Sequence, residues 1–149
     1  MSRTKVVKSQ DKFQMAVKYL TEYAGVQGAV IADSEGLVIA QCGSEDFDAE
    51  SFSALALEMT SSLDAILPRL IQPGVEFLSI KTSQNWMTIA RSPLFLLVVT
   101  AERNSDELLN VRIGRALEMI SSHFKNKYPQ ALNAGPTGIK AKNMEAIHV

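Results

Sequence analysis

The chain has 149 residues, of which 46% are hydrophobic and 21% are charged, and its formal net charge is −1. This composition is that of a single soluble globular domain, and it excludes a disordered or fibrous protein. No apolar run is long enough for a transmembrane helix or a secretion signal, and the single cysteine, Cys42, excludes an internal disulfide, so we expect a cytoplasmic protein without integral membrane association.

Charge is distributed unevenly along the chain. Residues 1–12 hold four basic side chains against one acidic, residues 125–149 also hold four against one, and the body between them holds seven basic and fourteen acidic side chains. A body with this acidic excess argues against a nucleic-acid surface. We interpret the two basic ends as solvated tails, with contact to an acidic partner or anionic lipid as the alternative.

The first predicted elements are a helix and a hairpin. Apolar residues at helical spacing predict a helix over residues 13–24, which Gly25 ends. Residues 26–32 and 37–42 have strand composition. Between them, Asp33-Ser34-Glu35-Gly36 is typical of a type I turn that ends on a glycine with positive φ.

The next segment has the most continuous apolar pattern. Apolar residues recur at helical spacing over about five turns, which predicts a long helix whose apolar stripe faces the core. Pro68 is expected to tighten or kink its last turn. The stripe consists of Phe52, Leu55, Ala56, Met59, Leu63, Ile66, Leu67 and Leu70.

Three strands are predicted after the long helix, over residues 75–82, 86–91 and 94–101. The connections between them are only two or three residues long, and such connections permit only antiparallel neighbours. The third strand lacks polar alternation, so we expect it at the centre of the sheet with both faces covered.

A final helix is expected to end near Lys125. Asn104 is the predicted N-cap, and Glu107 completes a capping box. The outer face of this helix is predicted to be polar apart from Val111, as on an ordinary solvated surface. Its inner face carries Leu109, Ile113, Ala116, Leu117, Ile120 and Phe124.

The predicted order α-β-β-α-β-β-β-α gives an α+β fold, a five-stranded antiparallel sheet with flanking helices. Four stretches in this order carry a resemblance: VQGAVIADSEGLVIA, FSALALEMTSSLDAIL, PGVEFLSIKTSQNWMTIA and LFLLVVTAERNSDELLNVRIGRALEMI. In them the chain resembles the roadblock/LC7 family, in its prokaryotic MglB-like branch. The resemblance covers a domain of residues 11–125 and leaves residues 1–10 as a basic tail and 126–149 as a flexible extension.

The resemblance implies a homodimer in which two sheets join, and a role as regulator or scaffold of a Ras-like small GTPase of the MglA type. It also implies that any stimulation of GTP hydrolysis works by rearranging residues of the GTPase rather than by inserting an arginine. Two alternatives stay open. One is a polarity or cytoskeletal scaffold, similar to a dynein light chain, that leaves nucleotide turnover unchanged. The other is a small-molecule sensor domain.

Residue patterns typical of catalysis or metal binding are scarce. His123 and His148 lack the spacing of metal ligands, and Cys42 has no base close in sequence. We therefore predict a non-enzymatic protein without catalytic residues, metal or cofactor. The acidic residues of segment 45–50 lack the offsets of a calcium loop and are interpreted as the solvated start of the long helix. Three arginines are formal candidates for an arginine finger, without a local feature in favour of any: Arg69, Arg91 and Arg103.

Two surfaces are predicted to bind protein. The outer face of the long helix is mostly small or apolar, and we expect it to pack in the dimer or against the GTPase. The second surface is the strand after this helix, which can pair with a second copy if it lies at a sheet edge. For Trp86 the sequence leaves two interpretations open, an anchor for a partner and a core residue. The residues are Ala54, Leu57, Glu58, Ser61 and Ala65 on the helix, and Val75, Phe77, Leu78 and Ile80 on the strand.

Overall fold

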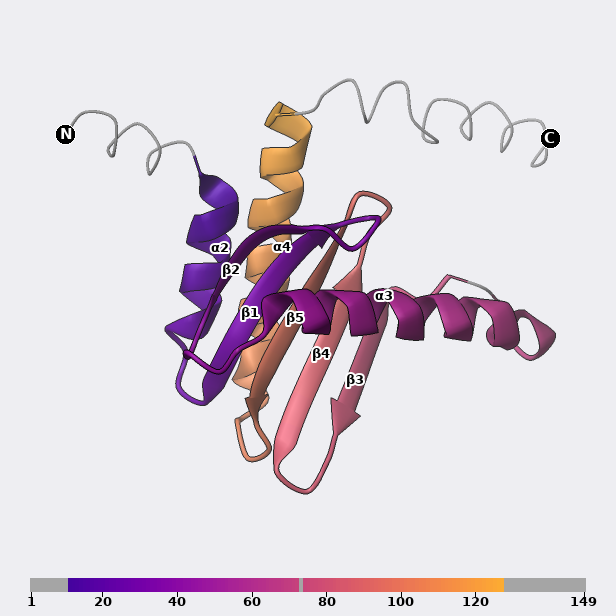
Figure 1. Cartoon of the computed structure of the whole chain (residues 1–149), viewed down its shortest axis with the longest axis horizontal. Coiled ribbons are helices and arrows are strands. Elements are labelled where there is room, and N and C mark those ends of the chain that lie inside the picture. Colours follow the sequence, from indigo (N-terminus) through magenta and orange to yellow (C-terminus); the bar gives the residue numbers. More distant parts are fainter. Residues whose placement is uncertain (1–10, 73, 128–149) are drawn as a thin grey trace.

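The computed structural model of the chain describes residues 11–72 and 74–127, so the predicted tails lie almost wholly outside the described residues. Figure 1 shows one antiparallel sheet with α2 and α4 on one face and α3 on the other. The sheet has five strands in the order β2-β1-β5-β4-β3, which confirms the predicted fold class. The elements are α2 (Lys12–Thr21), β1 (Val26–Asp33), β2 (Val38–Gly43), α3 (Ala49–Ile66), the 3-10 turn η1 (Leu67–Arg69), β3 (Phe77–Lys81), β4 (Asn85–Arg91), β5 (Phe95–Glu102) and α4 (Leu108–Lys127).

The hairpin of β1 and β2 closes as predicted. The amide of Gly36 donates to the carbonyl of Asp33, and Gly36 has a φ of 90°, which a glycine adopts without strain. The carboxylate of Asp33 accepts from the amides of Glu35 and Leu37 and so fixes the turn. At the outer edge of β2, the side-chain amide of Gln14 from α2 donates to the carbonyl of Gln41 at 2.8 Å.

Strand β5 lies at the centre of the sheet, as its continuous apolar sequence predicted. It pairs with β1 on one side and β4 on the other, and seven of its eight residues are buried. Because the sheet is covered on both faces, the core forms two clusters. One contains Phe13, Leu20, Ile31, Leu97, Val99 and Ile113 between the sheet and α2 with α4; the other contains Val30, Ala56, Ile89, Leu96 and Val98 beneath α3.

Helix α3 turns a line of small side chains toward the sheet, namely Ala49, Ser53, Ala56 and Thr60. Small residues let a helix approach a sheet closely, and the bulkier Phe52 and Met59 pack beside the line. The predicted apolar stripe is therefore only partly correct, since Leu55 and Ile66 are exposed.

The ends of two helices differ in how well the sequence predicted them. Pro68 tightens the last turn after α3 into η1, as expected. The predicted cap of α4 is wrong, because this helix begins at Leu108 and the side chain of Asp106 accepts from the Leu108 amide at 3.0 Å. Asn104 instead lies in the turn after β5.

Candidate functional site

Strand β3 forms one edge of the sheet, because within the described residues it pairs with β4 alone. This edge contains three of the four strand residues that the sequence singled out. Phe77 is 49% exposed, and Leu78 and Ile80 are half-buried. Val75 lies just before the strand. The edge position that the prediction required is thus observed.

The hydrogen bonds to β4 determine which backbone groups of β3 are open. The amide of Arg91 donates to the carbonyl of Glu76 at 2.8 Å, and the amide of Thr82 donates to the carbonyl of Asn85 at 2.9 Å. Because backbone groups alternate between the two sides of a strand, the even-numbered residues of β3 face β4. The N–H and C=O groups of Phe77, Ser79 and Lys81 therefore point away from the sheet.

The side chains of β3 alternate between the two faces of the sheet. Leu78 packs against the core cluster beneath α3. On the other face, the Nε1 of Trp86 donates to the Oγ of Ser79 at 2.6 Å, and the Nζ of Lys81 lies 4.5 Å from the Trp86 ring. Trp86 is buried, which favours a core residue over an anchor for a partner.

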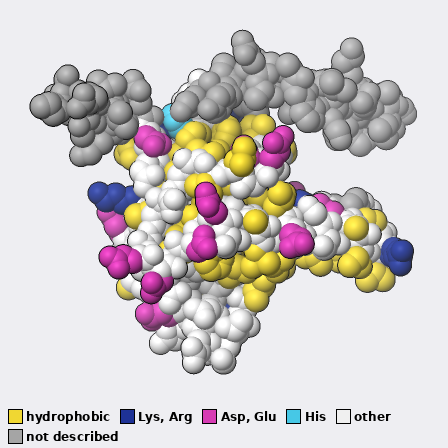
Figure 2. Space-filling model, in the orientation of Figure 1, with side chains coloured by type: hydrophobic (Ala, Val, Ile, Leu, Met, Phe, Trp, Pro, Cys, Tyr) yellow, Lys and Arg dark blue, Asp and Glu magenta, His cyan; other side chains and the backbone are white. Residues whose placement is uncertain are grey.

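Next to this edge, α3 extends beyond the sheet. A helix of 18 residues is about 27 Å long, whereas five strands span roughly 19 Å. Figure 1 shows α3 crossing the strands and continuing past β3, and Figure 2 shows hydrophobic side chains gathered on this projecting end. Ile66, Leu70 and Ile71 are 57 to 79% exposed there. Ile66 and Leu70 were predicted to lie in the core, and this prediction is wrong. The predicted helix is longer than a five-stranded sheet is wide, so its last turn had to extend beyond the core.

A small polar cluster ties the projecting end of α3 to the start of β3. Oδ1 of Asp64 accepts from the Val75 amide at 3.1 Å, and Oδ2 lies 2.6 Å from Nη2 of Arg91. Nε of Arg91 in turn donates to the Val75 carbonyl at 2.8 Å. The Val75 amide, and after it Arg91, hold the pKa of Asp64 below its usual value. Helix and edge strand are thereby held in one arrangement.

Of the five α3 residues predicted to form its outer face, four are exposed, namely Ala54, Glu58, Ser61 and Ala65. Leu57 is half-buried against the cluster beneath α3, so its assignment to the outer face is wrong. The reason is the rotation of the helix that brings the small residues onto the sheet. Leu57 and Ser61 border an open cleft of about 710 Å³ that extends to Glu76 and Arg91.

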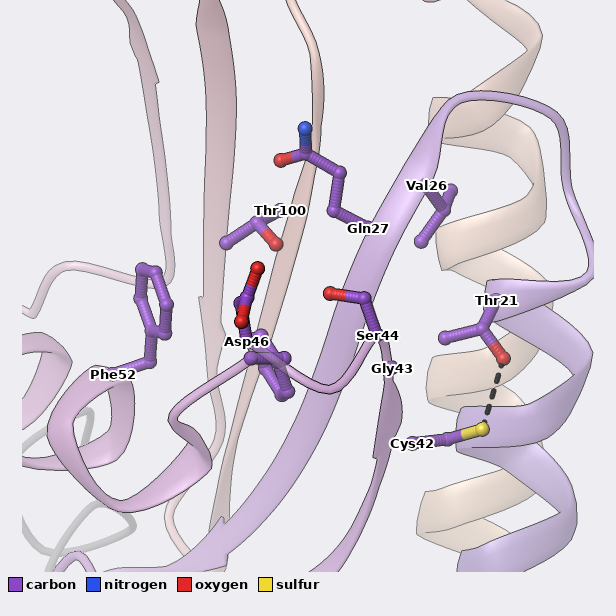
Figure 3. Close-up of a pocket in the computed structure, with 10 residues that line it drawn as sticks. Thr21, Val26, Gln27, Cys42, Gly43, Ser44, Asp46, Phe52 and Thr100 are labelled. Atoms are coloured by element: carbon purple, nitrogen blue, oxygen red, sulfur yellow. Dashed lines mark hydrogen bonds between the residues drawn. The ribbon is translucent and has the colours of Figure 1, made fainter.

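A second cleft of about 710 Å³ lies at the other end of the sheet, and Figure 3 shows its lining. Cys42 lies on the side of α2, where its sulfur accepts from the hydroxyl of Thr21 at 3.2 Å. Asp46 and Thr100 lie on the side of α3. The thiol and the carboxylate therefore do not converge, and no group of three metal-ligating side chains occurs within residues 11–72 and 74–127.

The acidic segment before α3 is a helix start, as the sequence predicted. Oδ1 of Asp48 accepts from the Ser51 amide at 3.1 Å and Oδ2 from the Ser51 hydroxyl at 2.6 Å. The hydroxyl, and after it the amide, keep the pKa of Asp48 below its usual value. Its carboxylate therefore caps the helix.

The structure shows the contacts of the histidines and arginines that lie within the described residues. The ring of His123 packs edge-on against Phe13 with centroids 4.4 Å apart, and His148 lies outside the described residues. Arg91 is bound to Asp64, and Nη1 of Arg103 donates to the carbonyl of Thr82 at 2.8 Å. Arg69 is exposed at the end of η1. Among the described helices, none has the length and apolar character needed to cross a bilayer.

Comparison with solved structures identifies the same fold in bacterial proteins. MglB of Myxococcus xanthus matches with a TM-score of 0.71 at 16% sequence identity, over 77% of this chain and 96% of that chain. A roadblock/LC7 domain from Streptomyces avermitilis matches with a TM-score of 0.67 at 18% identity, over 74% and 95% of the two chains. The gliding protein MglB of Thermus thermophilus matches with a TM-score of 0.67 at 13% identity, over 75% and 87%.

No curated protein matches the sequence. A family model does: that of the Roadblock/LC7 domain matches residues 12–101, from the start of α2 almost to the end of β5. The match covers more than half of the chain, and the fold agrees with that of the structural relatives. The chain belongs to the roadblock/LC7 family.

Proposed function

We propose that the chain is a non-enzymatic homodimer that regulates a Ras-like GTPase of the MglA type. The observation that carries the proposal is the edge strand β3, whose open backbone groups lie beside the exposed apolar end of α3. An uncovered edge of this kind invites pairing with another strand. The structural likeness to MglB supports a second copy as that partner.

In the proposed dimer, the open groups of β3 limit how two copies can pair. In an antiparallel ladder, only the outward-facing residues Phe77, Ser79 and Lys81 can exchange hydrogen bonds across the new junction. If the twofold axis passes through Ser79, Ser79 pairs with its own copy and Phe77 pairs with Lys81 of the partner subunit, so all three residues form hydrogen bonds. Leu78 then lies beside Ile80 of the partner subunit on the α3 face, where both side chains are half-buried in the single chain. This register covers the apolar side chains on that face.

The projecting end of α3 adds apolar contact to the same junction. Figure 1 shows α3 running past β3. In the proposed dimer, the end of α3 in each subunit would therefore reach over the sheet of the other. Ile66, Leu70 and Ile71 supply the apolar surface that such a contact would bury. The cluster of Asp64, Val75 and Arg91 keeps this end fixed before association, which lowers the entropic cost of binding.

The outer face of α3 is the proposed platform for the GTPase. Ala54, Ser61 and Ala65 are small and exposed, so a partner backbone can approach closely. In the paired sheet, both copies of α3 lie on the same face, which gives one continuous surface. The family resemblance supports a GTPase as the partner and a mechanism in which binding selects a conformation of the GTPase switches.

GTP turnover by an MglA-type GTPase, with and without the protein, tests the proposal. Ala65→Arg is expected to reduce binding and any stimulation, because a long charged side chain blocks close approach. Ala24→Arg introduces the same change at an exposed alanine beyond α2 and serves as the matched control. Binding with unchanged turnover supports the scaffold alternative. Absence of binding to the GTPase, or equal effects of the two variants, contradicts the platform.

A further inference from the structure

The face opposite α3 carries a groove between α2 and the start of α4. It has a volume of about 220 Å³ and is lined by Tyr19, Tyr23, Leu108, Val111, Arg112 and Arg115. We call it the α2–α4 groove. It lies on the far side of the sheet from the surface proposed for the GTPase, so it is available to a different partner.

Arg112 is held firmly in the groove. Its Nε donates to the carbonyl of Tyr19 at 3.0 Å, and its guanidinium carbon lies 4.0 Å from the ring centroid of Tyr19 and 5.4 Å from that of Tyr23. The hydroxyl of Tyr23 donates to Asp106, which raises the pKa of the Tyr23 phenol above its usual value. Two aromatic rings and one cation are therefore positioned before any partner arrives, and preorganised groups lose little entropy on binding.

The rim of the groove is apolar. Leu108 is 63% exposed and Val111 is 53% exposed. The sequence predicted a polar outer surface for α4 with Val111 as the single apolar exception. In the structure Leu108 is a second exposed apolar residue on this helix. Tyrosine and arginine are enriched in binding hot spots, and the two exposed aliphatic side chains add apolar surface beside them.

The positive charge of Arg115 favours a carboxylate on the partner of the groove. Of the nearby carboxylates, Asp106 accepts from Tyr23 and the Leu108 amide, and Glu22 lies 3.9 Å from Nη2 of Arg112. Arg115 is exposed, and within the described residues no carboxylate lies within ion-pair distance of it. Arginine binds carboxylates through two parallel hydrogen bonds. Among the described residues, the groove thus presents a cation that lacks a counter-charge.

We propose that the α2–α4 groove binds a short acidic segment of a partner protein, with an apolar side chain between Leu108 and Val111 and a carboxylate on Arg115. The basic C-terminal residues of the chain itself fit this charge poorly. Because the groove and the α3 surface lie on opposite faces, the acidic segment does not compete with a protein bound on α3. The proposal is independent of the proposed function.

The test is an NMR titration of the full chain, in which amide shifts are followed on adding the capped peptide acetyl-Glu-Leu-Glu-Glu-Leu-Glu-amide. Saturable shifts are expected at the groove, around Tyr19, Leu108 and Val111. The same peptide with lysine in place of glutamate is expected to give none. Arg115→Glu is expected to raise the dissociation constant about tenfold or more, and Val111→Ser is expected to weaken binding without a charge change. Arg69→Glu makes the same charge change on the opposite face and is the matched control.

Several outcomes overturn the proposal. Equal shifts with the lysine peptide, or equal weakening by Arg115→Glu and Arg69→Glu, show that the groove does not select carboxylates. Groove shifts that appear on dilution of the free protein identify a second copy as the occupant. Groove shifts on deletion of residues 128–149 identify the chain's own segment as the occupant.

Discussion

Replacing Phe77 by alanine tests the proposed pairing of two copies through β3 most directly. Phe77 lies in the edge strand and is 49% exposed in the single chain. Full burial of such a side chain contributes up to about 3 kcal/mol, so covering its exposed half contributes about 1–1.5 kcal/mol. A twofold interface contains the residue twice. The variant is therefore expected to weaken the dimer by about 2–3 kcal/mol, or roughly 30- to 150-fold in the dissociation constant.

Sedimentation equilibrium over a range of protein concentrations measures this loss of dimer affinity. Urea unfolding measures how much the variant lowers the free energy of unfolding of the single subunit. Leu37→Ala is the matched control, because Leu37 is 65% exposed but precedes β2 at the opposite edge of the sheet. Its dimer is expected to dissociate like the wild type. The reasoning is refuted if the wild type stays monomeric at high concentration, or if both variants weaken the dimer equally.

Three further variants test the packing and the electrostatics of the subunit. Gly28→Ala is expected to destabilise it by about 1–3 kcal/mol, because a Cβ at this position would lie 2.3 Å from the ring of Phe47. Gly114→Ala is expected to stabilise α4 by about 0.5–1 kcal/mol, because a Cβ at this position meets no atom within 4 Å. The urea midpoint should therefore fall for Gly28→Ala and rise for Gly114→Ala, and a shift of both midpoints in one direction would contradict the packing argument. Asp64→Asn is expected to lower the melting temperature at neutral pH, since the Val75 amide depresses the pKa of Asp64. A carboxylate with a depressed pKa stabilises the fold above the unfolded pKa of 3.8, and this stability is lost as the pH falls through the folded pKa. The melting temperatures of wild type and Asp64→Asn should therefore converge in acid. A difference in melting temperature that stays constant as the pH falls would count against the proposed role of the Asp64 carboxylate.

Local chemistry explains which parts of the fold the sequence predicts well. The turn at Gly36 follows from the conformational freedom of glycine and the side chain of Asp33, which act within four residues. The central position of β5 follows from its unbroken apolar sequence, because only a strand covered on both faces tolerates such a sequence. Both features depend on neighbouring residues alone.

The rotation of α3 could not be predicted in the same way. Hydrophobic periodicity reports which side chains avoid water, but it does not distinguish the core of one subunit from a surface that a second protein covers. Leu55 and Ile66 therefore entered the predicted core, and Leu57 was assigned to the outer face. Only the fit of the small side chains against the sheet resolves the rotation, and that fit depends on strands remote in sequence.

The candidate site could be predicted only in part, because its position depends on contacts between residues that are remote in sequence. The apolar character of β3 was visible in the sequence, but its edge position depends on the order of all five strands. The contacts that join Asp64 to Arg91, and Arg112 to Tyr19, connect residues far apart in the chain. Such contacts leave no local signal in a single sequence.

The hydrogen bond from Gln14 to the carbonyl of Gln41 makes the β2 edge of the sheet less available to an incoming strand than the β3 edge. It occupies an acceptor that an incoming strand would need at the β2 side of the sheet, and α2 stands beside that side. Growth of a sheet into fibrils requires an open edge strand on both sides of each molecule. Here one of the two edges has a backbone acceptor already in use, so pairing at β3 is favoured over continued strand addition.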